Sequence, residues 1–542
     1  MPVPFEQVVY SRLAFGPTTG DRERLKGMGL EPWLNQQLAP IEGASPLGDE
    51  PAVAKQLMAA RLHIEYKAGK LDNGQTYDAL KEDRPLLSLA MTLKDQLQLT
   101  RWDKAQDYAE RVRPLAELRT ATMIRARYAT MQLREVLADF WHNHFHVNAG
   151  GDDIRVSVSM PSYDRDVIRR HSLGNFREFL GAVATAPAML YYLNNAASKA
   201  SPANENYARE LFELHTLGRE RYMNGLYNRW RDVPGATEGK PSGYIDQDVY
   251  EAARAFTGWT VADGSWCGPG DEHFPAAGAF TYHDAWHDNY QKRVLGNEFD
   301  PNQAPMVDGQ RVLDLAAEHP GTALTICTKL CRRLVCDDPP SSLIERVVGV
   351  WRANMKAKDQ ISRVVRAIVL SPEFAATPSS KAKRPFELAI SFLRAVDGEF
   401  RTAHDWFWTL DEMGHRLFAW PSPTGHPDHS EFWLSTNMMV SRWNLPLRLM
   451  ADWFKGSRVR LLKQLPDAVG RLEKDDRVRQ VPVGFEKTLP WPRFSRRKTL
   501  ESISGRGQTG REQRRGHGAC AGKNLDSEPA VERFGDDPIA WI

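Results

Sequence analysis

Residues 133–147 read Leu133-Arg-Glu-Val-Leu-Ala-Asp-Phe-Trp-His-Asn-His-Phe-His-Val147 and lie at the end of the longest helical pattern in the chain, 116–145. Large apolar residues recur here every three or four positions, which is the spacing of one buried face of an α-helix. The apolar stripe of this helix consists of Leu133, Val136, Leu137, Phe140 and Trp141. The stretch therefore predicts a helix packed inside a mainly helical protein.

Helical periodicity also dominates on both sides of this stretch. Apolar residues spaced by three or four positions mark the ranges 52–71, 85–99, 312–374, 385–396 and 434–454. Two ranges rich in Gly, Pro and aromatic residues, 263–310 and 402–434, predict long loops, the first with a small hairpin. The expected fold class is mainly α, a multi-helix globular array with long aromatic and proline-rich loops and at most a small β-hairpin.

These patterns divide the chain into expected segments. They are an N-terminal helical segment (1–50), a helical domain with a histidine cluster (51–262), a loop-rich insertion (263–310), a C-terminal helical part packed on the same core (311–465) and a basic tail (477–542). Basic residues outnumber acidic ones in the first part of the tail, and apolar periodicity is weak there. This balance predicts disorder, with a basic arm that binds phosphates as the alternative.

The composition argues against two further classes of protein. With 71 basic and 69 acidic residues the net charge is +2, so a chain built mainly to coat nucleic acid is not expected. No apolar run approaches the roughly 18–20 residues that cross a bilayer. The N-terminal residues lack the basic and apolar regions of a signal peptide, so a cytoplasmic location is expected, with an exported protein as the alternative if the true start lies upstream.

Three of the five cysteines, Cys327, Cys331 and Cys336, lie within ten residues. Their C-x3-C-x4-C spacing is not that of a zinc knuckle. Cys327 and Cys331 lie in an apolar helical run and would share one helix face. We therefore expect structural thiols.

The opening stretch also carries three histidines, at positions 142, 144 and 146, in a chain that has 15. On a continuous helix His142 and His146 share a stripe with Glu135 and Asp139, while His144 faces elsewhere. If the chain instead extends after residue 141, all three imidazoles point the same way. Both geometries offer nitrogen donors to a divalent transition metal, with His142 and His144 as candidate ligands. The alternative is that the imidazoles are solvated or paired with Glu135 and Asp139.

A second polar segment, Asn204-Glu-Asn-Tyr-Ala-Arg-Glu-Leu-Phe-Glu-Leu-His-Thr-Leu-Gly218, predicts a helix capped by Asn204 and followed by Gly218. Glu210 and Glu213 lie one turn apart, a spacing found among metal ligands of helix bundles, although the Glu-x-x-His pairing is absent. Glu213 is the candidate metal ligand, Glu210 a candidate catalytic acid or base, and Arg209 a candidate anion clamp. An Arg209–Glu213 ion pair within the helix is the structural alternative.

Two His-Asp pairs follow in the loop Tyr282-His-Asp-Ala-Trp-His-Asp288. Polar side chains on a loop beside rigid helices often carry function. His283 and His287 are therefore candidate catalytic residues on a loop that could cover the site. A histidine bonded to an adjacent carboxylate would also stabilise the loop by itself.

Several motifs occur together in this chain. They are Arg12-Leu-Ala-Phe-Gly-Pro17, Phe140-Trp-His-Asn-His-Phe145, Asn204-Glu-Asn-Tyr-Ala-Arg-Glu-Leu211, Glu251-Ala-Ala-Arg-Ala-Phe-Thr-Gly-Trp259, Lys329-Leu-Cys-Arg-Arg333, Leu370-Ser-Pro-Glu-Phe374, Lys383-Arg-Pro-Phe-Glu-Leu388 and Trp420-Pro-Ser-Pro-Thr-Gly425. In this order, over residues from about 8 to 465, the chain resembles the bacterial family catalogued as domain of unknown function 1800.

The resemblance implies no established activity. It implies export for many members and a sulfatase-like partner protein encoded beside them, and it ranks His142 and His144 above His146. This chain departs from the family in showing no export signal and in its tail after about Arg479, which is unlike the family's usual ending.

Two classes of function follow from these residues. The first is a metal-dependent or acid/base hydrolase-like enzyme centred on His142, His144 and the helix from Asn204 to Glu213, because no fingerprint of a redox or group-transfer cofactor is present. The second is a non-catalytic binding or assembly protein for a partner protein or a polysaccharide, in which the polar segments are buried hydrogen-bond networks. Binding of nucleic acid through the basic tail is a weaker third possibility.

Overall fold

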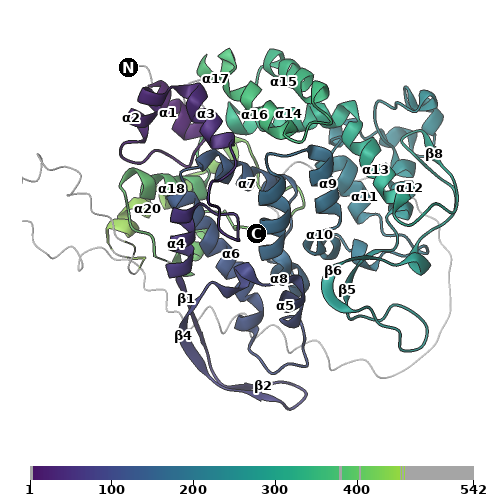
Figure 1. Cartoon of the computed structure of the whole chain (residues 1–542), viewed down its shortest axis with the longest axis horizontal. Coiled ribbons are helices and arrows are strands. Elements are labelled where there is room, and N and C mark those ends of the chain that lie inside the picture. The colour runs from purple at the N-terminus through teal and green to yellow at the C-terminus, as the bar shows by residue number, and fades with distance from the viewer. Residues whose placement is uncertain (1–3, 377–380, 402–403, 452, 455–456, 458–542) are drawn as a thin grey trace, which may run out of the picture. The chain divides into compact units, whose positions relative to one another are not determined.

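The computed structural model describes residues 4–376, 381–401, 404–451, 453–454 and 457, so the expected basic tail and Cys520 lie outside the described residues. The longest helical pattern forms two helices in the middle of the fold, α6 (Tyr108–Tyr128) and α7 (Gln132–His144), as Figure 1 shows. Between them the carboxylate of Glu50 caps the start of α7, because it accepts hydrogen bonds from the backbone N–H groups of Thr130 (3.0 Å) and Met131 (2.8 Å). The single helix predicted over 116–145 is thus a pair joined by a tight connection.

Helices from both ends of the chain pack against this pair. α3 contacts α7, α4 contacts α6, and α18 contacts both α6 and α20. The N-terminal helices are α1 (Phe5–Arg12), α2 (Asp21–Met28), α3 (Leu30–Leu38) and α4 (Pro51–Ala59). The last helices are α18 (Pro385–Ala395), α19 (His404–Glu412) and α20 (Thr436–Met450).

The middle of the chain contributes shorter helices. They are α5 (Leu93–Gln98), α8 (Ile154–Ser162), α9 (Phe176–Ala184), α10 (Pro187–Tyr192), α11 (Asn206–Glu210) and α12 (Asp246–Ala255). Two of them continue directly into wider π-helical segments, α8 into η2 (Tyr163–Arg169) and α11 into η4 (Leu211–His215). π-Helical turns are rare and often occur at functional sites.

A further group of helices follows the loop-rich part of the chain. They are α13 (Val307–Glu318), α14 (Pro320–Leu334), α15 (Ser341–Ala353), α16 (Gln360–Val369) and α17 (Pro372–Ala376). α14 packs against α15 and α16, while α13 packs against α9 and α12. This group confirms the helical periodicity of 312–374.

Strands are more numerous than the single hairpin that the sequence predicted. Within the described residues there are four two-stranded antiparallel sheets: β1 (Arg61–Tyr66) with β4 (Leu80–Pro85), β2 (Gly69–Lys70) with β3 (Thr76–Tyr77), β5 (Trp259–Asp263) with β6 (Ala276–Tyr282), and β7 (Lys292–Val294) with β8 (Asn297–Phe299). The fold class is nevertheless mainly α. The hairpin expected within 263–310 is present as β7 and β8.

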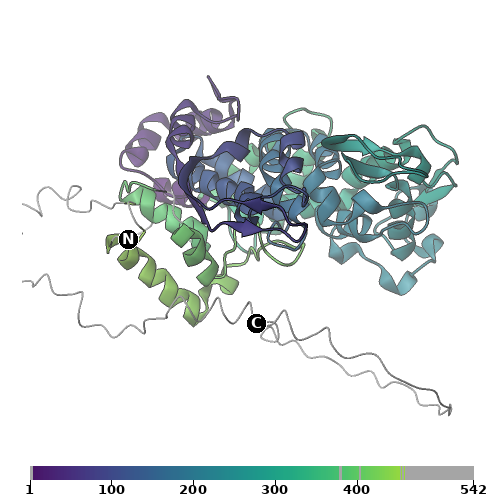
Figure 2. The same ribbon diagram turned by 90° about the horizontal axis from the view of Figure 1, so that it is seen from below.

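One helix prediction was wrong because its second half is a strand. The helix predicted over 52–71 ends at Ala59, and β1 follows it. In β1 Leu62 and Ile64 are buried, whereas the alternate residues face solvent, which is the two-residue period of a strand. Figure 1 shows this hairpin projecting beyond the helices in dark purple, and in Figure 2, seen from below, it lies in front of them.

One hydrophobic cluster runs through the described chain, from Val9 to Phe454, and the segments expected at 1–50, 51–262 and 311–465 all contribute to it. Cys327 and Cys331 are buried in this core, and both are free thiols, as expected. Among the described residues, no helix combines the length and the apolar character that crossing a membrane would require.

Candidate functional site

α7 continues as a helix through His144 and ends at Phe145, so the chain does not extend after residue 141. The acidic residues on its polar stripe bind arginines rather than histidines. Glu135 pairs with Arg169 (2.8 Å), and Asp139 pairs with Arg384 and Arg333. The predicted pairing of the histidines with Glu135 and Asp139 is therefore absent.

His142 is bound to a residue that the sequence did not suggest. Its Nε2 lies 2.9 Å from Oδ1 of Asp164, at the start of the π-helical segment η2. Asp164 is buried and also accepts hydrogen bonds from Arg125 (3.0 Å) and Arg169 (3.0 Å). Burial opposes ionisation of this carboxyl, but Arg169 and Arg125 together with His142 hold its pKa far below the ordinary value. Because Asp164 is ionised, the Nε2–H group of His142 donates to it.

His144 has both ring nitrogens engaged. Its Nε2 lies 3.2 Å from the carbonyl oxygen of His215, and its Nδ1 lies 3.2 Å from Nζ of Lys329. A carbonyl can only accept, so Nε2 carries the proton and Nδ1 accepts from the lysine. Burial, together with the charge of Lys329, lowers the pKa of His144 well below its ordinary value. This imidazole is neutral and has no free lone pair for a metal.

The rest of the stretch reaches towards the loop 420–426. Asn143 makes a pair of hydrogen bonds with the backbone of His426: its Nδ2 donates to the carbonyl oxygen (2.9 Å), and its Oδ1 accepts from the N–H group (2.6 Å). His146 donates from Nε2 to the carbonyl oxygen of Trp420 (2.8 Å). Burial lowers the pKa of His146 to about 4, so it too is neutral.

The structure does not bring the three candidate metal ligands together. His142 binds Asp164, His144 binds His215 and Lys329, and Glu213 pairs with Arg219 (3.1 Å). In the part of the chain that the structure describes, no group of three or more His, Cys, Asp and Glu side chains is arranged to hold a metal ion. The catalytic and metal roles assigned from the sequence stay predictions.

The second polar segment forms α11 and η4, and Gly218 follows it with a φ of +98°, as expected of a residue that ends a helix. The Arg209–Glu213 ion pair is not formed. Arg209 instead pairs with Glu205 (3.2 Å) and Asp246 (3.4 Å), because the wider η4 turn carries Glu213 towards Arg219. The charge of Arg209 is thus already balanced by two carboxylates.

Glu210 differs from its neighbours. It is partly buried, and among the described residues it has neither a hydrogen-bond partner nor an ion-pair partner. Burial and the nearby charge of Glu213 raise the pKa of Glu210 to about 7. Burial and the charge of Glu210 likewise raise the pKa of Tyr192 to about 12. Glu210 is therefore a carboxyl group that exchanges its proton near neutral pH.

The two loop histidines lie in another environment. His287 is buried, with Nδ1 at 2.9 Å from the carbonyl oxygen of Thr257 and Nε2 at 3.3 Å from Asp308. His283 packs against the rings of Phe274 and Trp286. Within the described residues, no hydrogen bond, ion pair or ring contact joins either histidine to α7 or η4. The loop is held instead by Thr257, just after α12, and by Asp308 of α13.

The sequence did not identify Asp164 and Lys329 as partners of the histidine stretch. It also did not identify Asn143, within the stretch, as a residue that binds another segment. Two of them belong to motifs quoted from the sequence, Asn143 to 140–145 and Lys329 to 329–333. Their place in those motifs was the signal that could have identified them as functional or structural partners. Asp164 lies in none of the motifs, so nothing in its local sequence could have found it.

The motifs themselves meet around α7. Motif 329–333 reaches His144 through Lys329 and Asp139 through Arg333. Motif 383–388 contributes Arg384, which binds Asp139, and Glu387, which binds Arg333 (2.5 Å). Motif 420–425 accepts the hydrogen bond from His146. Segments almost 300 residues apart in the chain therefore depend on one helix.

Comparison with known proteins agrees with these motifs. A family model described as a protein of unknown function (DUF1800) matches residues 8–515. The match continues past Arg479, farther than the motifs reach, so the expected departure after that residue does not end the similarity. No curated protein and no solved structure matches the chain.

Proposed function

The chain belongs to the DUF1800 family of proteins of unknown function, and on that premise we propose that it is a hydrolase-like acid/base enzyme whose proton-transferring group is Glu210. One observation carries the proposal: Glu210 is a partly buried carboxyl group with a pKa of about 7 and no partner among the described residues. Such a group can both deliver and accept a proton at neutral pH, which is the requirement for a general acid or base.

The neighbouring carboxylate has the opposite environment. Glu213 pairs with Arg219, whereas no cation of the described residues is bound to Glu210. A carboxyl group with a raised pKa beside a carboxylate that is paired with an arginine is a common basis for dividing the roles of acid and base. Glu210 would donate the proton to a leaving group, and Glu213 would orient the attacking water.

The backbone supports this assignment. Glu210 is the last residue of α11, and the π-helical segment η4 begins with the next residue. A π-helical turn changes the direction of the side chains that follow it, and such turns are enriched at functional sites. His215 ends the same segment, and its buried Nδ1 has no hydrogen-bond partner within the described ranges.

A metal-dependent form of the enzyme would need a different ligand set from the one that the sequence suggested. Both nitrogens of His144 are bound, and the Nε2 of His142 donates to Asp164. Glu213 would therefore need other donors. Elemental analysis of purified protein from metal-replete medium addresses this form: less than about a tenth of an equivalent of any transition metal would contradict it.

The test of the proposal compares Glu210→Gln with Glu345→Gln, an exposed glutamate on α15 that serves as the control. The proteins are screened against p-nitrophenyl esters, phosphates and glycosides. We expect Glu210→Gln to lower the rate on any accepted substrate by about 100-fold or more. The limb of the pH profile near 7 should disappear with it, while Glu345→Gln should change neither.

A second measurement does not depend on a substrate. Carbon-13 NMR of labelled glutamate side chains gives the pKa of Glu210 directly, by comparison with Glu210→Gln. Titration near 7 supports the proposal. Titration near the ordinary glutamate value of 4.5 would remove its basis, as would full activity of Glu210→Gln.

One observation favours a binding or assembly protein instead. In the loop region, Nζ of Lys199 lies 4.0 Å from the ring centre of Trp286 and 5.5 Å from that of Trp266, and Trp266 is 52% exposed. Exposed indoles suit stacking on sugar rings or contact with a partner protein, and the sulfatase-like partner implied by the family resemblance is a candidate. Loss of polysaccharide or partner binding in Trp266→Ala, with no hydrolysis of any substrate, would favour this function.

A further inference from the structure

A cavity of about 560 Å³ lies on the side of α7 that faces the N-terminal helices. Its walls are the connection between α3 and α4, the first half of α7, and the connection between η2 and α9. The volume falls within the roughly 300–1,000 Å³ that is usual for small-molecule sites. This cavity takes no part in the acid/base site proposed above.

The carboxylates around the cavity already have partners. Asp49 binds Arg125 (2.7 Å), Glu135 binds Arg169, and Asp166 binds Arg165. Glu50 accepts the N–H groups at the start of α7. Four carboxylates line the cavity, and each is satisfied within the protein.

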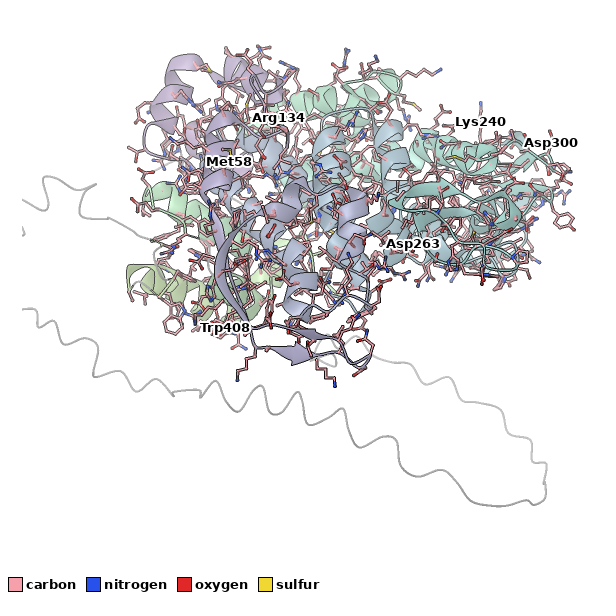
Figure 3. The ribbon with its side chains drawn as sticks, turned by 60° about the horizontal axis from the view of Figure 1, so that its bottom comes forward. Met58, Arg134, Lys240, Asp263, Asp300 and Trp408 are labelled. Carbon is pink, nitrogen blue, oxygen red and sulfur yellow. The ribbon has the colours of Figure 1, made fainter. Side chains whose placement is uncertain are left out.

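Two guanidinium groups on the walls are different, since neither has a carboxylate partner among the described residues. Arg134 donates from Nη2 to the carbonyl oxygen of Ala39, but its buried Nε has no hydrogen-bond partner in the described part of the chain. Arg170 lies on the exposed side of the cavity. Both guanidinium groups line the cavity, so an anion in the cavity is favoured beside their positive charge. Figure 3 labels Arg134 beside the purple N-terminal helices.

The remaining wall is apolar. Its residues come from the α3–α4 connection, α4, α7 and the segment before α9, and they include Pro40, Ile41, Ala44, Pro46, Leu47, Val53, Ala138 and Leu173. A ligand that fills the volume must therefore present apolar surface as well as negative charge.

We propose that this cavity binds a small organic carboxylate. The carboxylate group accepts hydrogen bonds from Arg134 and from Arg170, because a guanidinium matches the two oxygens of a carboxylate. The apolar body of the ligand packs against the proline and leucine side chains of the wall. The bound anion lies next to Glu135 and Arg169, and through Arg169 it is connected to Asp164 and His142.

Isothermal titration calorimetry of the full chain tests this site with three probes: benzoate, its neutral isostere benzamide, and inorganic phosphate. We expect benzoate to bind, with neither of the other two binding up to about 10 mM. Arg134→Gln should weaken benzoate binding about 10-fold or more, and Arg170→Gln should weaken it less because that group is exposed. Arg363→Gln, which removes an exposed arginine on α16, is the control and should bind as the wild type does.

A second variant keeps the test valid if Arg134→Gln fails to fold. Ala44 is exposed at the cavity wall, so Ala44→Trp fills the space without changing a charge and should also abolish benzoate binding. The proposal is overturned if the wild type does not bind benzoate, or if benzamide binds equally well. Binding of phosphate but not of benzoate would contradict the proposed apolar body of the ligand. Unchanged benzoate binding in Ala44→Trp would show that benzoate binds outside this cavity.

Discussion

At the scale of the residue, the histidine stretch shows how a buried polar side chain acquires its role from its partner. His142 faces an ionised carboxylate, and His144 lies between a carbonyl and a lysine. Buried polar groups require hydrogen-bond partners, and the core of this protein supplies a different one to each imidazole. Three histidines that are close in sequence therefore have separate structural tasks.

Asp164 should be the most sensitive residue of this network. In Asp164→Asn, Arg125 and Arg169 would lose a shared counter-ion in a buried site, which costs about 3–5 kcal/mol of unfolding free energy. Asp166→Asn, two residues away in η2, removes an exposed partner of Arg165 and should cost about 1 kcal/mol or less. Urea unfolding of both variants measures the difference. Equal losses would contradict the importance of the buried network.

At the scale of the element, α7 connects motifs that are distant in sequence. Asn143 binds the backbone of the 420–426 loop, and the carbonyl oxygen of the same residue lies where a side chain at Gly425 would be. A Cβ there would approach that oxygen to 2.3 Å, and φ is +72°, so only glycine fits. The glycine of motif 420–425 thus has a packing reason that involves motif 140–145.

Asn143→Ala tests this contact between elements. The variant loses both hydrogen bonds to His426 and should lose about 1–3 kcal/mol of unfolding free energy. Amide hydrogen exchange should accelerate in residues 420–426 more than in α7. Asn354→Ala, which removes the hydrogen bonds of that side chain to Val350 and Arg363 at the end of α15, is the control for general destabilisation. Uniform acceleration throughout the chain would show that Asn143 does not hold this loop specifically.

At the scale of the whole molecule, several buried histidines are neutral because the core excludes solvent from them. Burial lowers the pKa of His146 to about 4 and those of His215 and His415 to about 3. In the unfolded chain these imidazoles return to their ordinary value of 6.5. Between these values the unfolded state binds more protons than the folded state, so stability is present above pH 6.5 and is lost as the pH falls.

His146→Gln measures one part of this effect, because glutamine can still donate to Trp420 but does not titrate. Between pH 6.5 and pH 4.5 the wild type should lose about 2–3 kcal/mol more unfolding free energy than the variant. His429→Gln, at an exposed position, is the control and should follow the wild type. Urea unfolding at several pH values gives the slopes. Parallel slopes for wild type and His146→Gln would show that His146 is not held neutral.

The mainly helical class, the helices of 312–374 and the ends of the second polar segment followed from local sequence. Helical periodicity and a glycine after the last turn are local properties, so they can be predicted without knowing the partners. The strand β1 was missed because Leu62 and Ile64 show the two-residue period only once, directly after the helical spacing of α4. The break before α7 was missed because the group that causes it, Glu50, is about 80 residues away in sequence.

By itself the sequence determined that the stretch beginning at Leu133 forms a buried helix rich in polar side chains, and which residue types lie on it. Only the tertiary structure decided what those side chains do, because each partner comes from another part of the chain: Asp164, Lys329, Trp420 and His426. The same holds for Glu210. Its pKa depends on burial and on the turn of η4 that brings Glu213 near it, and neither can be deduced from the spacing of two glutamates.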